Sequence, residues 1–194
     1  PGTPATAALT PAGVFVFAPA AIAQIPPTGY QDTKEVLIPR LRRAGLSVAP
    51  YITEQPCFRV AGTRNYLAVQ EALLARWLAA AAPPPGYRRH GEALVHATAT
   101  VAPDALVLGP ALIAAGARVA GETTLVGPVV LMRDSVVERG AVVSRAAIWP
   151  GAQIAARGRV DRAIVVSGAA TRPGQNLWHT LLLPGDSPVA TVED

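Results

Sequence analysis

The sequence contains little cysteine, lysine, methionine or aromatic residue. Of its 194 residues one is cysteine, one is methionine and 5% are aromatic. Because Cys57 has no second cysteine to pair with, an internal disulfide is excluded, and we expect a reducing, cytoplasmic location. We interpret Cys57, which lies beside Phe58, as a small buried hydrophobe. The only methionine is Met132, so we expect a chain that begins at Pro1 to be a fragment or a processed product.

Long apolar runs and concentrated charge are also absent. Pro19, Gln24 and Pro26 break the longest apolar stretch, so no membrane span is predicted. The net charge of +4 comes from scattered arginines, with Lys34 as the single lysine, and such scatter does not indicate nucleic-acid binding. With 51% hydrophobic and 15% charged residues, disorder is excluded for most of the chain.

What the sequence does contain is an aliphatic residue at every sixth position of its second half. An α-helix repeats its apolar face every three to four residues and a strand every two, so a period of six fits neither element. The pattern predicts a parallel β-helix in which each hexad makes one short strand and one corner, with the aliphatic residue inside. The aliphatic series is Val95, Val101, Val107, Ile113, Val119, Leu125, Leu131, Val137 and Val143.

A second series of mostly small residues lies two positions before the aliphatic one, and glycine and proline fall where the chain must turn. After Val143 the aliphatic spacing slips by one, and the series resumes as Ile148, Ile154, Val160 and Val166. About four coils of roughly eighteen residues are predicted between about residues 91 and 170. The small series is Ala99, Ala105, Ala111, Ala117, Thr123, Ser135, Ala141 and Ala147, with Val129 as the bulkier member.

This repeat resembles the hexapeptide-repeat family, whose fold is a left-handed triangular β-helix with three hexads per coil. The resemblance, not the pattern, implies the left hand, because the general rule for parallel crossovers gives the opposite hand. The segment 175–184 is apolar enough to cover the far end of the β-helix. A β-helix is a scaffold that hosts several functions, so the fold alone does not assign one.

The first 82 residues follow a different pattern, typical of an α/β domain. A helix in two pieces is predicted over residues 31–45, with Asp32 as its cap, a break at Pro39 and an end at Gly45. Thr63 is expected to cap a second helix that carries Leu67, Leu74 and Leu78 on one face. Strands are predicted over residues 12–17, 46–52 and 58–61.

The predicted domain organisation therefore has four parts. Residues 1–82 form a partial α/β domain, and residues 83–90, with three consecutive prolines, form a stiff linker. Residues 91–184 form the β-helix with its C-terminal cap, and residues 185–194 form a tail.

The stretches "AGVFVFAP", "QDTKEVLIPRLRRAGLSVAPY" and "FRVAGTRNYLAVQEALL" resemble, in order, the C-terminal half of a sugar-1-phosphate nucleotidyltransferase domain with a Rossmann-like fold. Members of that family often carry hexapeptide repeats after this domain. The resemblance implies a reaction of a nucleoside triphosphate with a sugar 1-phosphate that yields a nucleotide sugar and pyrophosphate, with Mg²⁺ in the intact enzyme. The family's glycine-rich phosphate loop is missing, so we expect this chain alone to be inactive and to bind no Mg²⁺.

Two residues depart from the family pattern inside the matched segment. Pro11 stands where the family has an asparagine that helps to hold the sugar. Val60 stands where the family has a metal-binding aspartate, and valine cannot coordinate Mg²⁺. These departures indicate either a divergent enzyme or a domain that has lost catalysis.

The resemblance implies five candidate substrate-binding residues, each with a structural alternative. Gly13 is placed to let the backbone approach a sugar, or only to turn the chain. Asp32, Lys34 and Glu35 match the start of a family helix near the sugar pocket, although helix capping explains Asp32 equally well. Arg59 faces a phosphate or lies on a solvated strand.

Histidines matter because hexapeptide-repeat acyltransferases use one as a general base. The chain offers His90, His96 and His179, but none has an acidic neighbour in sequence to orient it, and no long loop interrupts residues 95–147. We interpret all three as surface residues.

Three hypotheses follow: a portion of a nucleotidyltransferase that makes nucleotide sugars for polysaccharide synthesis, a non-catalytic regulatory or scaffold subunit of that family, and a hexapeptide-repeat acyltransferase. The intact enzyme would bind a sugar phosphate and a nucleoside triphosphate. A homo-oligomer assembled through the β-helix is predicted from outward apolar residues such as Leu108, Leu112 and Met132. No nucleic-acid or membrane partner is expected.

Overall fold

The structure is a computed structural model that describes residues 12–54, 57–185 and 188–190, the last three by their backbone only. The chain divides into two compact units after Arg59. No helix in the described part of the chain has the length and apolarity needed to cross a membrane.

The first unit contains three short helical segments, α1 (Pro19–Ile22), η1 (Thr33–Leu37) and α2 (Ile38–Arg43). The Asp32 carboxylate caps η1 by accepting hydrogen bonds of 2.7 Å from the backbone N–H groups of Lys34 and Glu35. Pro39 lies in the first turn of α2, where its missing N–H costs no hydrogen bond. Gly45, with a φ of +74°, follows the last turn. The predicted helix in two pieces is therefore confirmed.

The three strands predicted for this part are not present. Residues 12–17, 46–52 and 58–61, all within the described residues, form no strand, and the side chains of Val16 and Tyr51 are almost fully exposed. A strand is stable only when a neighbouring strand pairs with its backbone N–H and C=O groups, and no strand among the described residues pairs with these segments. The described residues therefore do not show the expected Rossmann-like half-domain, and Cys57 is exposed rather than buried.

Helix α3 (Thr63–Ala79) is the second predicted helix. Thr63 is its first residue and not its cap, which is Gly62 and makes no side-chain hydrogen bond. Leu74 is buried and Leu67 and Leu78 are half-buried, as the predicted apolar face requires. The helix belongs to the second unit together with the β-helix, whereas the sequence had placed it in a domain ending at residue 82.

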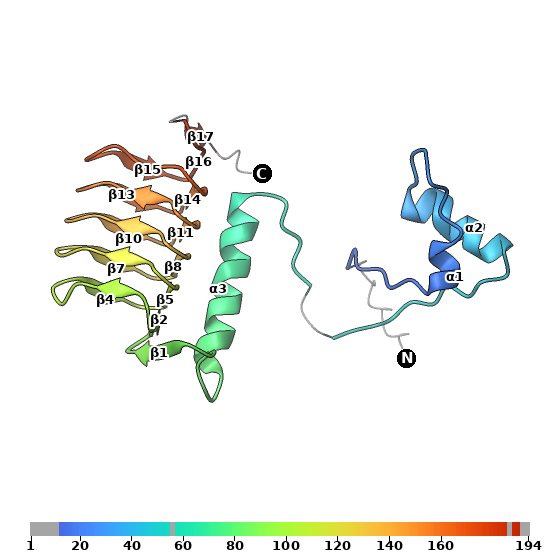
Figure 1. The fold of residues 1–194 in the computed structure, drawn as a ribbon, viewed down its shortest axis with the longest axis horizontal. Coiled ribbons are helices and arrows are strands. Elements are labelled where there is room, and N and C mark those ends of the chain that lie inside the picture. The colour runs from blue at the N-terminus through green and yellow to red at the C-terminus, as the bar shows by residue number, and fades with distance from the viewer. Residues whose placement is uncertain (1–11, 55–56, 186–187, 191–194) are drawn as a thin grey trace, which may run out of the picture. The chain divides into compact units, whose positions relative to one another are not determined.

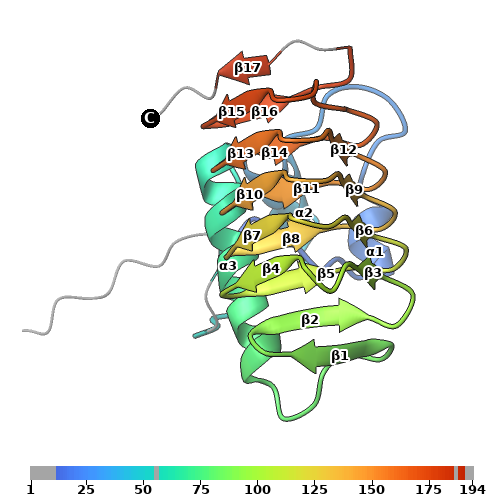
Figure 2. The same cartoon turned by 90° about the vertical axis from the view of Figure 1, so that its left-hand side faces the viewer.

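The rest of the second unit is a parallel β-helix of three sheets, whose coils stack along one axis (Figures 1 and 2). Within the described residues the eight-stranded sheet consists of β1 (Tyr87–His90), β2 (Ala93–His96), β5 (Ala111–Ile113), β8 (Val129–Leu131), β11 (Ala147–Ile148), β14 (Ile164–Val165), β16 (Thr180–Leu182) and β17 (Pro188–Ala190). The five-stranded sheet consists of β4 (Leu106–Leu108), β7 (Thr124–Val126), β10 (Val142–Ser144), β13 (Arg159–Asp161) and β15 (Asn176–Trp178). The four-stranded sheet consists of β3 (Thr100–Val101), β6 (Arg118–Val119), β9 (Val136–Val137) and β12 (Gln153–Ile154).

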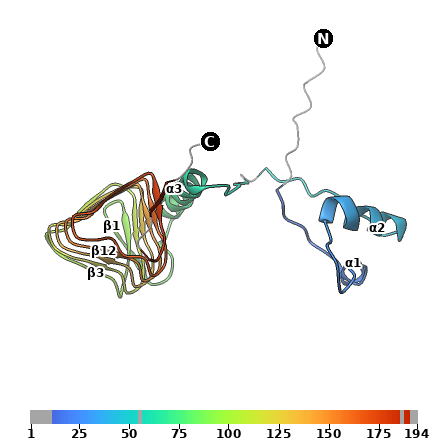
Figure 3. The same cartoon turned by 90° about the horizontal axis from the view of Figure 1, so that it is seen from above.

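The first four coils each take one strand from each sheet, and the fifth coil replaces its strand in the four-stranded sheet with a single bridge between Gln153 and Ala170. The cross-section is a triangle (Figure 3). The coils rise from β2 toward β16, and seen from above the chain passes clockwise around the triangle as it climbs toward the viewer. The β-helix is therefore left-handed, as the repeat resemblance implies.

The sixth-position aliphatics form the core, as predicted. Ile113, Leu125, Leu131, Val137 and Val143 are fully buried in one continuous cluster. Only the first-coil members of the series, Val95, Val101 and Val107, are partly exposed, because no complete coil lies below them. Burial of such side chains supplies the main stabilising free energy of the stack.

The later coils are one residue shorter than the first two. Val107, Leu125 and Val143 stack at intervals of 18 residues, but Val143, Val160 and Leu177 stack at intervals of 17. The predicted period of six therefore fails once per late coil, always between the five-stranded and the eight-stranded sheet. About five turns form where four were expected, because the coils continue beyond residue 170 through β15 and β16.

This shortening corrects two positions of the predicted pattern. Val165, which pairs with Ile148, is the buried residue of its coil, and Val166, which the sequence had placed inside, is half-buried next to it. In the same way Ala147 belongs to the outward row that contains Val130, so Ala146 is the small inward residue.

Both ends of the eight-stranded sheet are closed by antiparallel strands. β1 pairs with β2 at the first coil, and β17 pairs with β16 at the last. Residues 175–184 do not form a separate cap. They complete the last coil, with Leu177 and Leu182 in the core.

Helix α3 packs along the outer face of the eight-stranded sheet (Figures 1 and 3). The Tyr66 and Trp149 rings lie 5.8 Å apart, and the Gln70 amide donates to the carbonyl oxygen of Ala146 at 3.3 Å. At the other end of the helix, the Arg89 guanidinium donates to the carbonyl oxygens of Leu78 and Ala80. The helix covers an outward row of the sheet that is too apolar for solvent, in which Leu94 and Val130 are buried.

Candidate functional site at one corner of the β-helix

The corner that leads from the five-stranded to the eight-stranded sheet changes character along the stack. The first two coils turn through Gly109-Pro110 and Gly127-Pro128, which present no polar side chain. Each later coil turns with a single residue in the left-handed conformation. These residues are Arg145, Arg162 and His179, with φ of +46°, +47° and +48°.

This conformation is unfavourable for long side chains. A residue other than glycine in the left-handed region costs about 1–2 kcal/mol, and glycine or asparagine would remove much of that cost. The same strained position carries a basic side chain in three successive coils. Neighbouring strands lie about 4.8 Å apart, so the three side chains form a closely spaced row.

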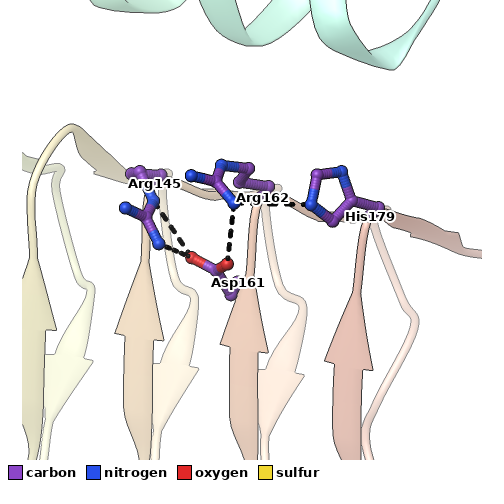
Figure 4. Close-up of polar contacts among 4 residues, drawn as sticks. All are labelled: Arg145, Asp161, Arg162 and His179. Carbon is purple, nitrogen blue, oxygen red and sulfur yellow. Dashed lines mark hydrogen bonds and ion pairs between the residues drawn. The ribbon is translucent and has the colours of Figure 1, made fainter. Parts of the chain in front are cut away.

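One carboxylate lies within the row (Figure 4). The Arg145 guanidinium donates through Nε and Nη2 to Asp161 Oδ1, at 3.1 and 2.6 Å. Arg162 Nη1 lies 3.6 Å from Asp161 Oδ2 and donates to His179 Nε2 at 3.4 Å. Helix α3 passes beside the row, and its Gln70 contacts the residue that follows Arg145.

Asp161 is held in its charged form. Burial by itself would raise the pKa of the carboxyl, but hydrogen bonds from Arg145 and Ser144, together with the charges of Arg145 and Arg162, bring it below its ordinary value. The row therefore combines two guanidinium groups with a single carboxylate, which leaves it with positive charge.

The row is accessible to a ligand. The side chains of Arg145 and Arg162 are each 44% exposed. Within the described residues no hydrogen-bond acceptor contacts Arg145 Nη1 or Arg162 Nη2. Trp178, which pairs in register with Asp161, is 69% exposed, and its ring lies 6.2 Å from that of His179 at 30°.

Of the five residues predicted to bind substrate, three lie close together in the first unit. Asp32 contacts the backbone of Lys34 and Glu35 as a helix cap, and the side chains of Lys34 and Glu35 are exposed. Gly13 has a φ of +75° and open space around it, and Arg59 is exposed. No contact of either with the helix start is found among the described residues. A substrate-binding role for these five residues remains a prediction.

The histidines differ in their surroundings. His96 Nδ1 accepts a hydrogen bond from the Thr98 backbone N–H at 3.1 Å and lies 2.9 Å from the Thr98 hydroxyl. The Thr98 hydroxyl also accepts a hydrogen bond from the Gly116 backbone N–H, so His96 and Thr98 together hold this corner of the first two coils. His90 is exposed on β1. His179 lies in the corner row beside Arg162.

A metal site is not formed in the part of the chain that the structure describes. No group of three or more His, Cys, Asp or Glu side chains there is placed to hold an ion. The position at which the nucleotidyltransferase resemblance expects a metal-binding aspartate holds Val60, whose side chain has no donor atom. At this position the described residues do not fit Mg²⁺.

Sequence reasoning missed the corner row, although a signal was present. The triplets Ser144-Arg145-Ala146, Asp161-Arg162-Ala163 and Trp178-His179-Thr180 recur at intervals of 17 residues. A search for a period of six breaks at these positions, whereas a search for a period of 17 would have aligned the three basic residues.

Comparison with known proteins found no matching protein family and no matching curated protein. Among solved structures, the acetyltransferase domain of PglB from Neisseria gonorrhoeae FA1090, in complex with acetyl coenzyme A, matches with 19% identity and a TM-score of 0.37. That match covers 48% of this chain and 57% of the domain. A hexapeptide transferase family protein from Anaplasma phagocytophilum matches with 18% identity and a TM-score of 0.30, over 46% of this chain and 72% of that protein.

Proposed function

We propose that this chain is the β-helical portion of a hexapeptide-repeat transferase, and that it binds substrate and assembles the protein rather than carrying the catalytic group. The observation that supports this is the position of α3. The helix ends the segment that resembles a sugar-1-phosphate nucleotidyltransferase, and it packs on the β-helix through Tyr66 and Gln70. The last helix of the matched segment and the repeats therefore belong to one packed unit.

Within this proposal the intact protein transfers a nucleotidyl group to a sugar 1-phosphate, and residues 12–59 contribute to the sugar-phosphate site. The support for this chemistry is the ordered sequence resemblance alone. Val60 and the missing phosphate loop favour a chain without catalysis of its own, because nucleotidyl transfer depends on a bound metal and on donors around the phosphates. The β-helix is also proposed to join copies of the chain through the exposed face of the five-stranded sheet, where Leu106 and Leu108 are more than half exposed.

The experiment combines a binding assay with an activity assay on the purified chain. Ligand-observed NMR should detect mannose 1-phosphate or glucose 1-phosphate, with a weaker signal for Lys34→Ala and an unchanged one for Arg42→Ala. Mg²⁺-dependent pyrophosphorolysis of nucleotide sugars should be absent. Binding of neither sugar phosphate, or pyrophosphorolysis above background, would contradict the proposal.

Acyl transfer is the second candidate, and the observation that favours it is His179. This histidine lies at an exposed corner beside Arg162, and hexapeptide-repeat acyltransferases use a histidine to take a proton from the acceptor. Its Nε2, however, accepts a hydrogen bond from Arg162, so the proton-accepting atom is already occupied. Release of coenzyme A from acetyl coenzyme A in the presence of amino sugars, lost in His179→Ala and kept in His90→Ala, would establish this candidate over the first.

A further inference from the structure

We infer that the corner row of Arg145, Arg162 and His179, together with Trp178, binds the nucleoside diphosphate part of a ligand. The inference goes beyond the proposed function and does not depend on which group is transferred. Sugar nucleotides and coenzyme A both contain a nucleoside diphosphate, so the shared chemistry is a diphosphate next to a planar base.

The positive charge of the row supports the binding of a diphosphate. Two guanidinium groups share one carboxylate, and each keeps a terminal nitrogen that no described residue accepts from. Guanidinium groups bind phosphate oxygens through paired, charge-assisted hydrogen bonds. The spacing of about 4.8 Å between coils allows two successive arginines to contact two linked phosphates.

The backbone gives an independent argument. Left-handed residues other than glycine also occur at the other corners, as Glu122, Asp134 and Arg157, but among the described residues only this corner carries one in three successive coils. Glycine or asparagine would be accommodated at each of these three positions at less cost. Strained positions persist where the surrounding structure and a function maintain them. Below the row the corner is Gly-Pro, whose two residues present no polar side chain to a ligand lying along it.

The aromatic pair of Trp178 and His179 supports the binding of a planar base. Trp178 lies one strand above Asp161 and is 69% exposed, with His179 stacked against it. An exposed indole offers a face on which a base can stack, and such stacking contributes about 1–3 kcal/mol per base. The indole and the arginines lie on successive coils, which suits the short distance between a base and its phosphates.

The test uses isothermal titration calorimetry at low salt with the whole chain and three ligands: pyrophosphate, UDP-glucose and coenzyme A. Arg162→Asn removes one guanidinium and relieves the backbone, so the variant is expected to fold. Arg157→Asn is the matched control, because Arg157 is an exposed arginine with a φ of +59° at a different corner. Trp178→Ala tests the base separately.

We expect saturable binding of pyrophosphate that Arg162→Asn weakens about tenfold or more, the effect of losing one charge-assisted hydrogen bond, and that Arg157→Asn changes less than twofold. UDP-glucose or coenzyme A should bind more tightly than pyrophosphate, and Trp178→Ala should remove that advantage without affecting pyrophosphate. The tighter of the two identifies the source of the diphosphate.

Absence of saturable pyrophosphate binding would overturn the inference. Equal losses in the Arg162 and Arg157 variants would also overturn it, because they would indicate attraction by net charge only. If neither nucleotide ligand binds more tightly than pyrophosphate, the nucleoside part is wrong. None of these results depends on sugar-phosphate binding by residues 12–59 or on any transfer activity.

Discussion

Val165 and Val166 offer a direct test of the shortened coils, because the same substitution at two adjacent valines should have very different effects. Val165 is fully buried between Ile148 and Leu182, and Val166 is half-buried at the corner that follows. A coil of 18 residues would exchange the two positions. Val165→Asp and Val166→Asp therefore report which residue enters the core.

The expected magnitude follows from burial. Val165→Asp loses the burial of a valine side chain, about 1.5–3 kcal/mol, and leaves a carboxyl group in the core without a partner, at about 1–3 kcal/mol. The sum is about 2.5–6 kcal/mol of unfolding free energy. Val166→Asp keeps its carboxylate at the surface and should cost about 1 kcal/mol or less.

Thermal unfolding followed by circular dichroism measures the difference. For a chain of this length each kcal/mol shifts Tm by about 2–4 °C, so Val165→Asp should lower Tm by at least about 5 °C. Val166→Asp should lower it by less than about 4 °C. Equal losses, or a larger loss for Val166→Asp, would refute the 17-residue register and with it the alignment of Arg145, Arg162 and His179.

Two further predictions concern the turn and the assembly. Gly127→Ala should lower the unfolding free energy by about 1–3 kcal/mol, because a Cβ at this position would lie 2.5 Å from the backbone nitrogen and oxygen of Pro110. An unchanged midpoint of urea unfolding would contradict this prediction and show that the backbone of the corner shifts to make room for the methyl group. The whole chain should have the mass of a dimer or trimer in light scattering at micromolar concentration, and Leu108→Arg should dissociate it while Leu73→Arg on α3 does not. A monomer mass for the parent protein would contradict assembly through the five-stranded sheet.

In the first unit the predicted helix is confirmed and the predicted strands are wrong. The cap at Asp32 and the stop at Gly45 are local, since they involve hydrogen bonds and dihedral angles within a few residues, and both were predictable. The predicted strand over residues 12–17 failed because a strand depends on a partner from elsewhere in the fold. Strand propensity alone does not form a strand when no neighbouring strand pairs with the segment, and Val14 and Val16 are exposed.

By itself the sequence determined the β-helix and its core. The period of six placed Ile113 to Val143 inside correctly, since every hexad makes the same local strand and corner and the burial of its aliphatic residue repeats. Only the tertiary structure decided the length of each coil. Removing one residue at a corner keeps the strands in register but changes which residue faces inward, and this is settled by stacking on the coil below. The corner row followed from that decision, because Arg145, Arg162 and His179 are 17 residues apart in sequence and become neighbours only when the coils stack.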